Sequence, residues 1–211
     1  MALRSSLPFA SCYVYAPRGE GLLAAQARAL CQRLKSSDPR WLPRYAGYVA
    51  ALAARPGFVA QLLARDAWLV PVPGSAAAAP QGSAAWQLAV ALHALGLGRG
   101  LWPGLVRRSP VRKSATALPG ARPTLAQHYD SFAVDPAPRG PGGKLVLVDD
   151  VITRGRTLLA AAARLRGALP HADVRAFALV RTTGYLARLE RLRAPCAGVV
   201  YWAGGDVRRE P

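Results

Sequence analysis

The chain has 211 residues, a formal net charge of +17 and 52% hydrophobic residues. This length and composition predict a globular protein with a real core and exclude an intrinsically disordered chain. No apolar run reaches the roughly 18–20 residues that a bilayer-spanning helix needs. Residues 1–17 also lack the continuous apolar stretch of a signal peptide, so we expect a cytoplasmic protein.

Basic residues outnumber acidic ones by 28 to 11, and 25 of the basic residues are arginines. Such a balance favours polyanionic partners such as nucleic acids or phosphorylated metabolites. No helix-turn-helix, RNP-like or zinc-finger pattern accompanies the charge. We therefore expect at most non-specific nucleic-acid contact through the basic surface, and no membrane partner. Compositional bias on solvated helix faces is the alternative explanation.

The three cysteines are scattered along the chain, at Cys12, Cys31 and Cys196. An odd number of thiols without any CxxC pair indicates a reducing compartment and offers no zinc-ligand spacing.

The first 66 residues are predicted to be mainly helical. A short strand is expected at 12–17, where CYVYAP alternates aromatic and small residues. Helical periodicity and the stop signals SSDP and RPG predict the helices that follow. These helices are expected at 20–35, 43–54 and 57–66. We assign 1–66 to an N-terminal hood segment and 67–211 to the core domain.

The middle of the chain alternates short strands with one helix and long loops. The segment 96–104 is glycine-rich but does not fit G-x-G-x-x-G, because Leu101 stands at the last glycine position. The segment 110–130 contains three prolines and is predicted to be a long loop, a length that is typical of lids. The other predictions here are strands at 67–74 and 105–109 and a helix at 84–95.

The C-terminal part carries the clearest alternation of strand and helix. Strands are predicted at 131–135, 144–150, 173–182 and 197–205, and helices at 157–169 and 184–193. Strands that alternate with helices indicate βαβ units and hence an α/β fold with a mostly parallel sheet flanked by helices.

The stretch LVLVDDVITRGRTLL (145–159) combines a buried strand, two acids and a turn that opens a helix. Ligands of open parallel sheets bind at the carboxyl ends of the strands, where Asp149 and Asp150 stand. Two adjacent carboxylates suit the two hydroxyls of a furanose ring, and a divalent cation would stabilise them. The N–H groups of the turn 153–157 suit a phosphate. The pattern therefore predicts a sugar phosphate site, the alternative being an acidic strand exit before an ordinary Thr-capped helix.

VLVDDVITRGRT strongly resembles the phosphoribosyl-diphosphate (PRPP) binding motif of type I phosphoribosyltransferases. The resemblance implies a glycosyltransferase of nucleotide metabolism that displaces pyrophosphate from PRPP, with Mg²⁺ held at Asp149 and Asp150. It also implies that PRPP contacts the motif and the loop after the P-V-P sequence. The residues so implied are Asp149, Asp150, Val151, Thr153, Arg154, Gly155, Arg156, Thr157, Gly74 and Ser75.

A wider similarity points to ComF-like proteins, the branch associated with competence. YVYAP, Arg33-Leu34-Lys35 and VPVPG (70–74) occur in the order expected of that branch. The N-terminal zinc-ribbon cysteines are missing, and GSAAAAPQGSAAWQ replaces the basic segment expected after P-V-P. These departures leave open a non-catalytic PRPP- or nucleotide-binding regulator, or a DNA-uptake accessory protein, as the alternative to an enzyme.

The basic stretch RRSPVRKS (107–114) is the predicted lid over the diphosphate. Arg107, Arg108, Arg112 and Lys113 supply its charge, and Arg112 and Lys113 are the residues we expect to act in catalysis by stabilising the leaving group. His128 is a further ligand candidate, although a lone histidine is more often structural. The sequence does not distinguish between a nitrogenous base and an amine as the acceptor. It is also compatible with a homodimer.

Overall fold

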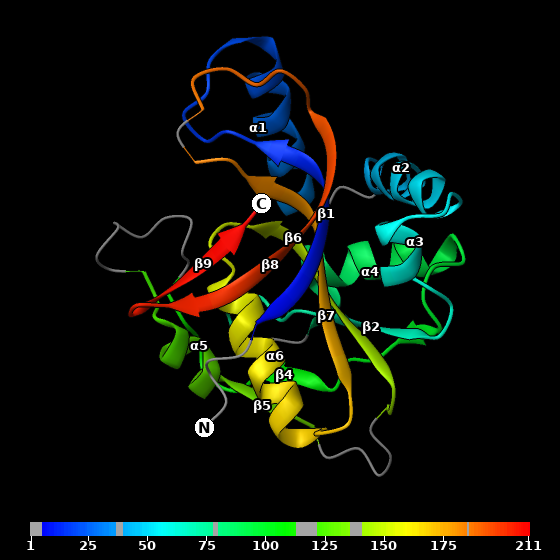
Figure 1. Cartoon of the computed structure of the whole chain (residues 1–211), viewed down its shortest axis with the longest axis vertical. Helices are drawn as coiled ribbons and strands as arrows, with labels where there is room; N and C mark the ends of the chain where they lie inside the picture. The colour runs from blue at the N-terminus through cyan, green and yellow to red at the C-terminus, as the bar shows by residue number, and fades with distance from the viewer. Residues whose placement is uncertain (1–5, 37–39, 78–79, 113–121, 136–140, 185) are drawn as a thin grey trace.

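The computed structural model of the chain describes residues 6–36, 40–77, 80–112, 122–135, 141–184 and 186–211. These residues form an α/β fold around a seven-stranded, mostly parallel sheet, as the sequence predicts (Figure 1). Five neighbouring strands run parallel, and the last two pair antiparallel. In spatial order the strands are β3 (Gly100–Leu101), β2 (Ala67–Pro71), β6 (Lys144–Ile152), β7 (Asp173–Thr182), β1 (Leu7–Tyr15), β8 (Arg193–Ala203) and β9 (Asp206–Glu210).

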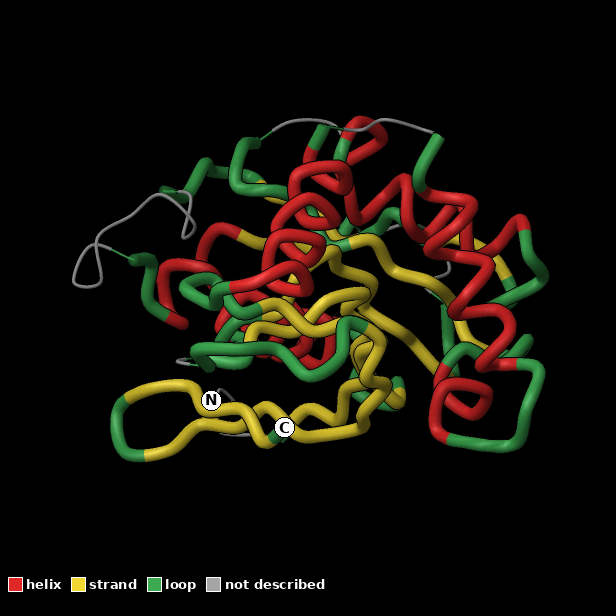
Figure 2. Tube along the Cα trace, turned by 90° about the horizontal axis from the view of Figure 1, so that it is seen from above, coloured by secondary structure: helices red, strands yellow, loops and turns green. Residues whose placement is uncertain are grey.

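Helices cover both faces of this sheet. One face carries α2 (Leu42–Ala53), α3 (Phe58–Leu62), α4 (Ala84–Ala94) and the inner side of α1 (Gly21–Lys35). The other face carries α6 (Arg156–Ala168) and α5 (Leu125–Ser131), with the small antiparallel sheet of β4 (Leu105–Arg107) and β5 (Phe132–Val134). The β8–β9 hairpin lies at the outer edge of the molecule, on the left in Figures 1 and 2. None of the described helices has the length and apolar character to cross a membrane.

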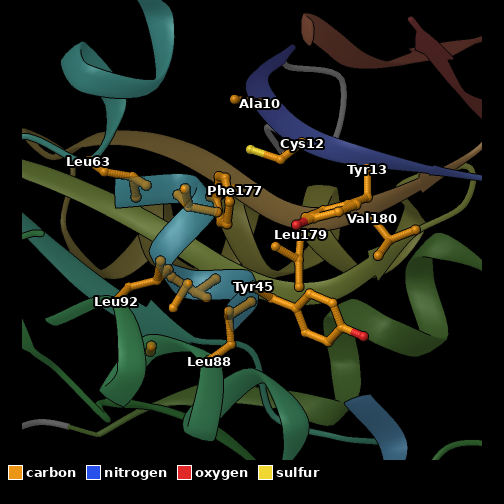
Figure 3. Packing of buried hydrophobic residues seen from close by; sticks show 14 of the residues in the cluster. Ala10, Cys12, Tyr13, Tyr45, Leu63, Leu88, Leu92, Phe177, Leu179 and Val180 are labelled. Carbon is orange, nitrogen blue, oxygen red and sulfur yellow. The ribbon is translucent and has the colours of Figure 1, made fainter. Parts of the chain in front are cut away.

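The parallel strands are buried on both faces because their side chains alternate between two cores. In β6, Leu145 and Leu147 join the core under α6, whereas Val146 and Val148 join the core under α4. Figure 3 shows Leu88 and Leu92 of α4 on the side of the sheet that carries Phe177. Every residue of the apolar run 145–148 is therefore buried, and successive residues are buried on opposite faces of the sheet.

The N-terminal segment is part of the sheet. β1 begins at Leu7, earlier than predicted, and pairs with β7 and β8. The two predicted segments, 1–66 and 67–211, therefore both contribute strands to one sheet. A boundary at residue 66 does not mark the edge of that sheet. The helices predicted within 1–66 are present, with α3 shorter than expected.

Part of the predicted loop 110–130 is helical. Thr124 and Gln127 form a capping box, in which the Thr124 side chain accepts the Gln127 N–H and the Gln127 side chain accepts the Thr124 N–H. This reciprocal cap starts α5 at Leu125, and α5 packs against α6. The 3₁₀ turn Pro80–Gly82 precedes α4 within the low-complexity segment.

The helix predicted at 184–193 is wrong. The described residues of that segment run as irregular chain into β8, which begins at Arg193. Their carbonyls bond elsewhere: Ala187 O accepts the N–H of Glu20, and Leu192 O accepts the N–H of Val14. Leu189 is buried against β1 and α1, so tertiary contacts override the helical pattern.

Candidate functional site

Two adjacent carboxylates stand at the carboxyl end of β6, near the middle of the parallel sheet. β6 continues to Ile152, so Asp149 and Asp150 belong to the strand rather than to the loop after it. The Oδ1 atom of Asp149 accepts the Asp150 N–H at 2.9 Å, and Oδ1 of Asp150 accepts the Val151 N–H at 2.9 Å. These short-range bonds hold both carboxylates at the strand end.

Asp149 is in an unfavourable environment for its charge. Burial raises the pKa of Asp149 well above its usual range, the neighbouring Asp150 raises it further, and Arg107 opposes the shift. Hydroxyl donors or a cation at this carboxylate would relieve the penalty. Two carboxylates plus ligand phosphate oxygens are a set that Mg²⁺ accepts, so Asp149 and Asp150 fit the implied metal. No group of three His, Cys, Asp or Glu side chains suited to a metal occurs within the described ranges.

The turn after β6 is built to expose backbone N–H groups at the start of α6. Gly155 is the residue before the helix and has φ = +88°, in the left-handed region. A Cβ at this position would lie 2.6 Å from Cγ1 of Val200, so glycine is required for both conformation and space. α6 has 13 residues and no acidic residue in its first turn. Its unpaired N–H groups and dipole therefore favour an anion beside Thr153 and Thr157.

Two residues of β9 form hydrogen bonds with this turn. The Asp206 carboxylate accepts a bidentate pair from Arg156, at 2.8 and 2.7 Å, and a third hydrogen bond from Arg154 Nη1 at 2.5 Å. Arg209 donates to the carbonyl of Thr153 at 2.9 Å. Both arginines of the motif thus line the site while paired with one carboxylate, which partly neutralises their charge.

We expect the Asp206 pairing to contribute pH-dependent stability. Hydrogen bonding to Arg156 is the main cause that lowers the pKa of Asp206 to about 2. A depressed carboxyl pKa stabilises the fold above its unfolded value of about 4, and the contribution is lost as pH falls toward the folded value. Because the Asp206 side chain is 36% exposed, solvent screening limits the effect to about 1 kcal/mol.

Urea unfolding of wild type and Asp206→Asn at several pH values measures this contribution. The variant should be less stable at neutral pH, and the difference should shrink as the pH approaches the acid range. A difference that is constant with pH would show that the carboxylate charge is not its source.

The loop after β2 is held by Arg107. Its guanidinium donates to the carbonyls of Pro73 and Gly74 and to Oγ of Ser131, and it lies 4.1 Å from the centroid of the Phe132 ring. Arg107 is 6% exposed and lies in β4, so its assignment to a lid is wrong. Burial lowers the pKa of Arg107 to about 10, which leaves it charged at neutral pH.

The outer part of the basic stretch is more open. Arg112 is exposed, and the neighbouring Val111 donates its N–H to the carbonyl of Ser75 at 2.9 Å. This bond ties the stretch to the loop after β2. Lys113, the other residue predicted to act in catalysis, lies outside the described residues.

Two cavities adjoin at the carboxyl end of β6. The first, of about 420 Å³, is lined by the turn 153–157 and by Tyr15, Pro17 and Thr182. The second, of about 560 Å³, is lined by the loop after β2, the start of α4, Arg107 and Arg112. Their shared lining residues are Lys35, His128, Asp149, Asp150, Val151 and Thr157. The two carboxylates therefore stand between the turn 153–157 and the second cavity.

His128 belongs to this shared wall. It is 3% exposed, and its Nε2 lies 3.5 Å from Oγ1 of Thr157. Burial, followed by the charges of Arg107 and Arg156, lowers the pKa of His128 to about 4. The imidazole is therefore neutral at physiological pH and adds no positive charge to the site.

The described residues predicted to contact PRPP, and Arg112, line one cavity or both, whereas Arg108 of the predicted lid is exposed and lines neither. Gly74 and Ser75 line the second cavity with Arg112, and Val151 lines both. Sequence reasoning missed Lys35, Arg122 and Asp206 as site residues. Asp206 lies about fifty residues beyond the motif, and no local pattern marks it as a partner.

The chain matches no protein-family model, and no curated protein matches it. Function is therefore inferred from the residues of the site.

Proposed function

We propose that the chain is a PRPP-binding phosphoribosyltransferase of the type I kind. It would transfer a 5-phosphoribosyl group to a nitrogenous base or amine and release pyrophosphate. The observation that carries this proposal is the pair of adjoining cavities with Asp149 and Asp150 in their common wall.

The two cavities match the two ends of PRPP. The ligand has a phosphate on C5, a diphosphate on C1 and a ribose with two free hydroxyls between them. The turn 153–157 would bind the 5-phosphate through N–H groups, and the carboxylates would accept the ribose hydroxyls. The diphosphate would then lie in the second cavity near Arg107, Arg112 and the loop at Gly74.

The chemistry requires a leaving group that is stabilised as the C1–O bond breaks. The departing diphosphate takes the electron pair, the acceptor nitrogen bonds to C1, and that nitrogen then loses a proton. Arg112 and the N–H groups of the loop after β2 would stabilise the negative charge on the diphosphate. A Mg²⁺ ion bound at Asp149 and Asp150 would supply further neutralisation of the diphosphate oxygens.

The acceptor would enter the part of the first cavity that is lined by residues outside the motif. Tyr15 and Pro17 at the end of β1, and Thr182 at the end of β7, line it there. Burial raises the pKa of the Tyr15 hydroxyl, so it remains protonated and can donate a hydrogen bond at neutral pH.

Turnover is tested by acceptor-dependent release of pyrophosphate. Purified protein, PRPP and Mg²⁺ are incubated with individual purine and pyrimidine bases and with amines, and the expected result is release with one acceptor class. Release should disappear in Asp149→Asn/Asp150→Asn. PRPP binding without release for any acceptor would instead assign the chain to a non-catalytic PRPP-binding regulator.

A further inference from the structure

A chain of hydrogen bonds runs beneath the site and connects the two ligand-binding turns. It starts at the loop after β2, passes through Arg107, Ser131 and His128, and ends at Thr157. Three of its members, Arg107, His128 and Ser131, are the buried charged or polar residues of this part of the molecule. Hydrogen bonds in a buried, low-dielectric site are stronger than in water, so this network restrains the groups that it joins. Among the described residues, Nδ1 of His128 has no hydrogen-bond partner.

Arg107 fixes the loop at its own end of the chain. It donates Nε–H to the carbonyl of Gly74, and its Nη2 lies 3.4 Å from the carbonyl of Pro73. In a planar trans peptide the N–H points opposite to the C=O, so fixing these two carbonyls also fixes the N–H groups of Gly74 and Ser75. Those N–H groups belong to residues that line the second cavity.

Ser131 connects Arg107 with α5. Its Oγ accepts Nη1–H of Arg107 and donates to the carbonyl of His128 at 2.7 Å. The backbone of the same segment adds a bond, because Arg108 N–H donates to the carbonyl of Ser131 at 2.8 Å. Ser131 is 2% exposed, so water does not compete for these bonds.

His128 completes the connection at the turn 153–157. Its Nε2 faces the Thr157 hydroxyl, and Thr157 lies in the first turn of α6. α5 is itself fixed on α6, because Arg164 donates to the carbonyl of Tyr129 at 2.7 Å and lies over its ring. The imidazole therefore has a fixed position from which to orient the Thr157 hydroxyl.

We propose that Arg107 and His128, joined through Ser131, are positioning residues that hold the two turns at the separation required by one ligand with an anionic group at each end. This inference rests on the proposed function, which places the 5-phosphate at one turn and the diphosphate at the other. A ligand that binds both turns gains from preorganisation, whereas a fragment that binds one turn does not need their separation.

Calorimetric titration with PRPP, ribose 5-phosphate and inorganic pyrophosphate, each with Mg²⁺, separates these contributions. In Ser131→Ala we expect affinity for PRPP to fall about 10-fold, while affinity for each fragment falls less than about 3-fold, as expected for loss of one buried hydrogen-bonded connection. Arg107→Lys keeps the charge but loses the planar guanidinium that binds several acceptors at once. This variant should therefore weaken the binding of PRPP and pyrophosphate more than that of ribose 5-phosphate. The matched control is Arg44→Lys, at an exposed position of α2 that lines neither cavity, and it should leave all three affinities unchanged.

Two variants of His128 test the other end of the chain. His128→Leu should weaken PRPP about 10-fold, whereas His128→Gln keeps a polar group within reach of Thr157 and should recover most of that loss. Wild-type affinity for PRPP in both Ser131→Ala and His128→Leu would overturn the inference. Equal losses for all three ligands would also overturn it, because they would show only general damage to the fold. If the wild type itself bound none of the three ligands, the proposed function would fail instead.

Discussion

Replacement of both carboxylates, in Asp149→Asn/Asp150→Asn, is expected to abolish PRPP binding and to stabilise the protein at neutral pH. The hydrogen bonds that the two carboxylates would accept from the two ribose hydroxyls are expected to contribute roughly 3 kcal/mol or more in total, which corresponds to at least about a 100-fold loss of affinity. Calorimetric titration with PRPP and Mg²⁺ measures this loss.

The gain in stability follows from the environment of Asp149. Burial and the neighbouring Asp150 raise the pKa of Asp149. The protein therefore loses stability as the pH rises above the unfolded value of about 4, because the unfolded chain gives up this proton more readily than the folded protein. The neutral amide of Asn removes the penalty. The difference in free energy of unfolding between variant and wild type should therefore be largest at neutral pH and disappear below about pH 4.

Asp173→Asn is the matched control for this variant. Asp173 begins β7 at the opposite end of the sheet and pairs with Arg175 at the surface. The substitution should change neither PRPP affinity nor the pH dependence of stability appreciably. Retained PRPP affinity in the double Asn variant would contradict the role assigned to the two carboxylates.

Gly155→Ala is expected to damage both the fold and the turn 153–157. The left-handed backbone costs a non-glycine residue about 1–2 kcal/mol, and overlap with Val200 adds a similar amount. We expect a loss of about 2–4 kcal/mol in the free energy of unfolding, together with weaker binding of ribose 5-phosphate, because the turn must shift to admit the methyl group. Chemical denaturation and calorimetry measure the two effects.

The same helix offers the control. Gly167 lies in the last turns of α6 with an ordinary helical backbone, and a methyl group added there would point into open space. Gly167→Ala should stabilise the protein by about 0.5–1 kcal/mol and leave ligand binding unchanged. Equal stabilities for the two alanine variants would show that the turn does not require glycine at residue 155.

The sequence predicted those parts of the structure whose causes are local. The run before Asp149 is apolar at every position because both faces of β6 are covered, and that continuity identified the strand. The glycine-containing turn and the helix after it are also encoded within a few residues. For the same reason the sequence alone indicates residues 149–157 as the candidate site for the proposed sugar phosphate.

The parts that were missed depend on distant contacts or on signals that were not used. Arg107 was assigned to a lid because it belongs to a run of cations that could close over a diphosphate, whereas in the structure it lies in β4, paired with β5, and is buried. The helix at 184–193 failed because Leu189 and the local carbonyls are used by β1 and α1. Two local signals could have been used: the Thr124–Gln127 capping box of α5, and Gly204–Gly205, whose positive φ angles turn the chain into β9.

Titration of the wild-type protein with PRPP and Mg²⁺ is the most direct test of the account. A ligand that spans both cavities should bind with a stoichiometry of one per chain, more tightly than ribose 5-phosphate or pyrophosphate, and both fragments should displace it. Absence of PRPP binding, or binding that neither fragment displaces, would contradict the proposal that the two cavities beside Asp149 and Asp150 form a single PRPP site.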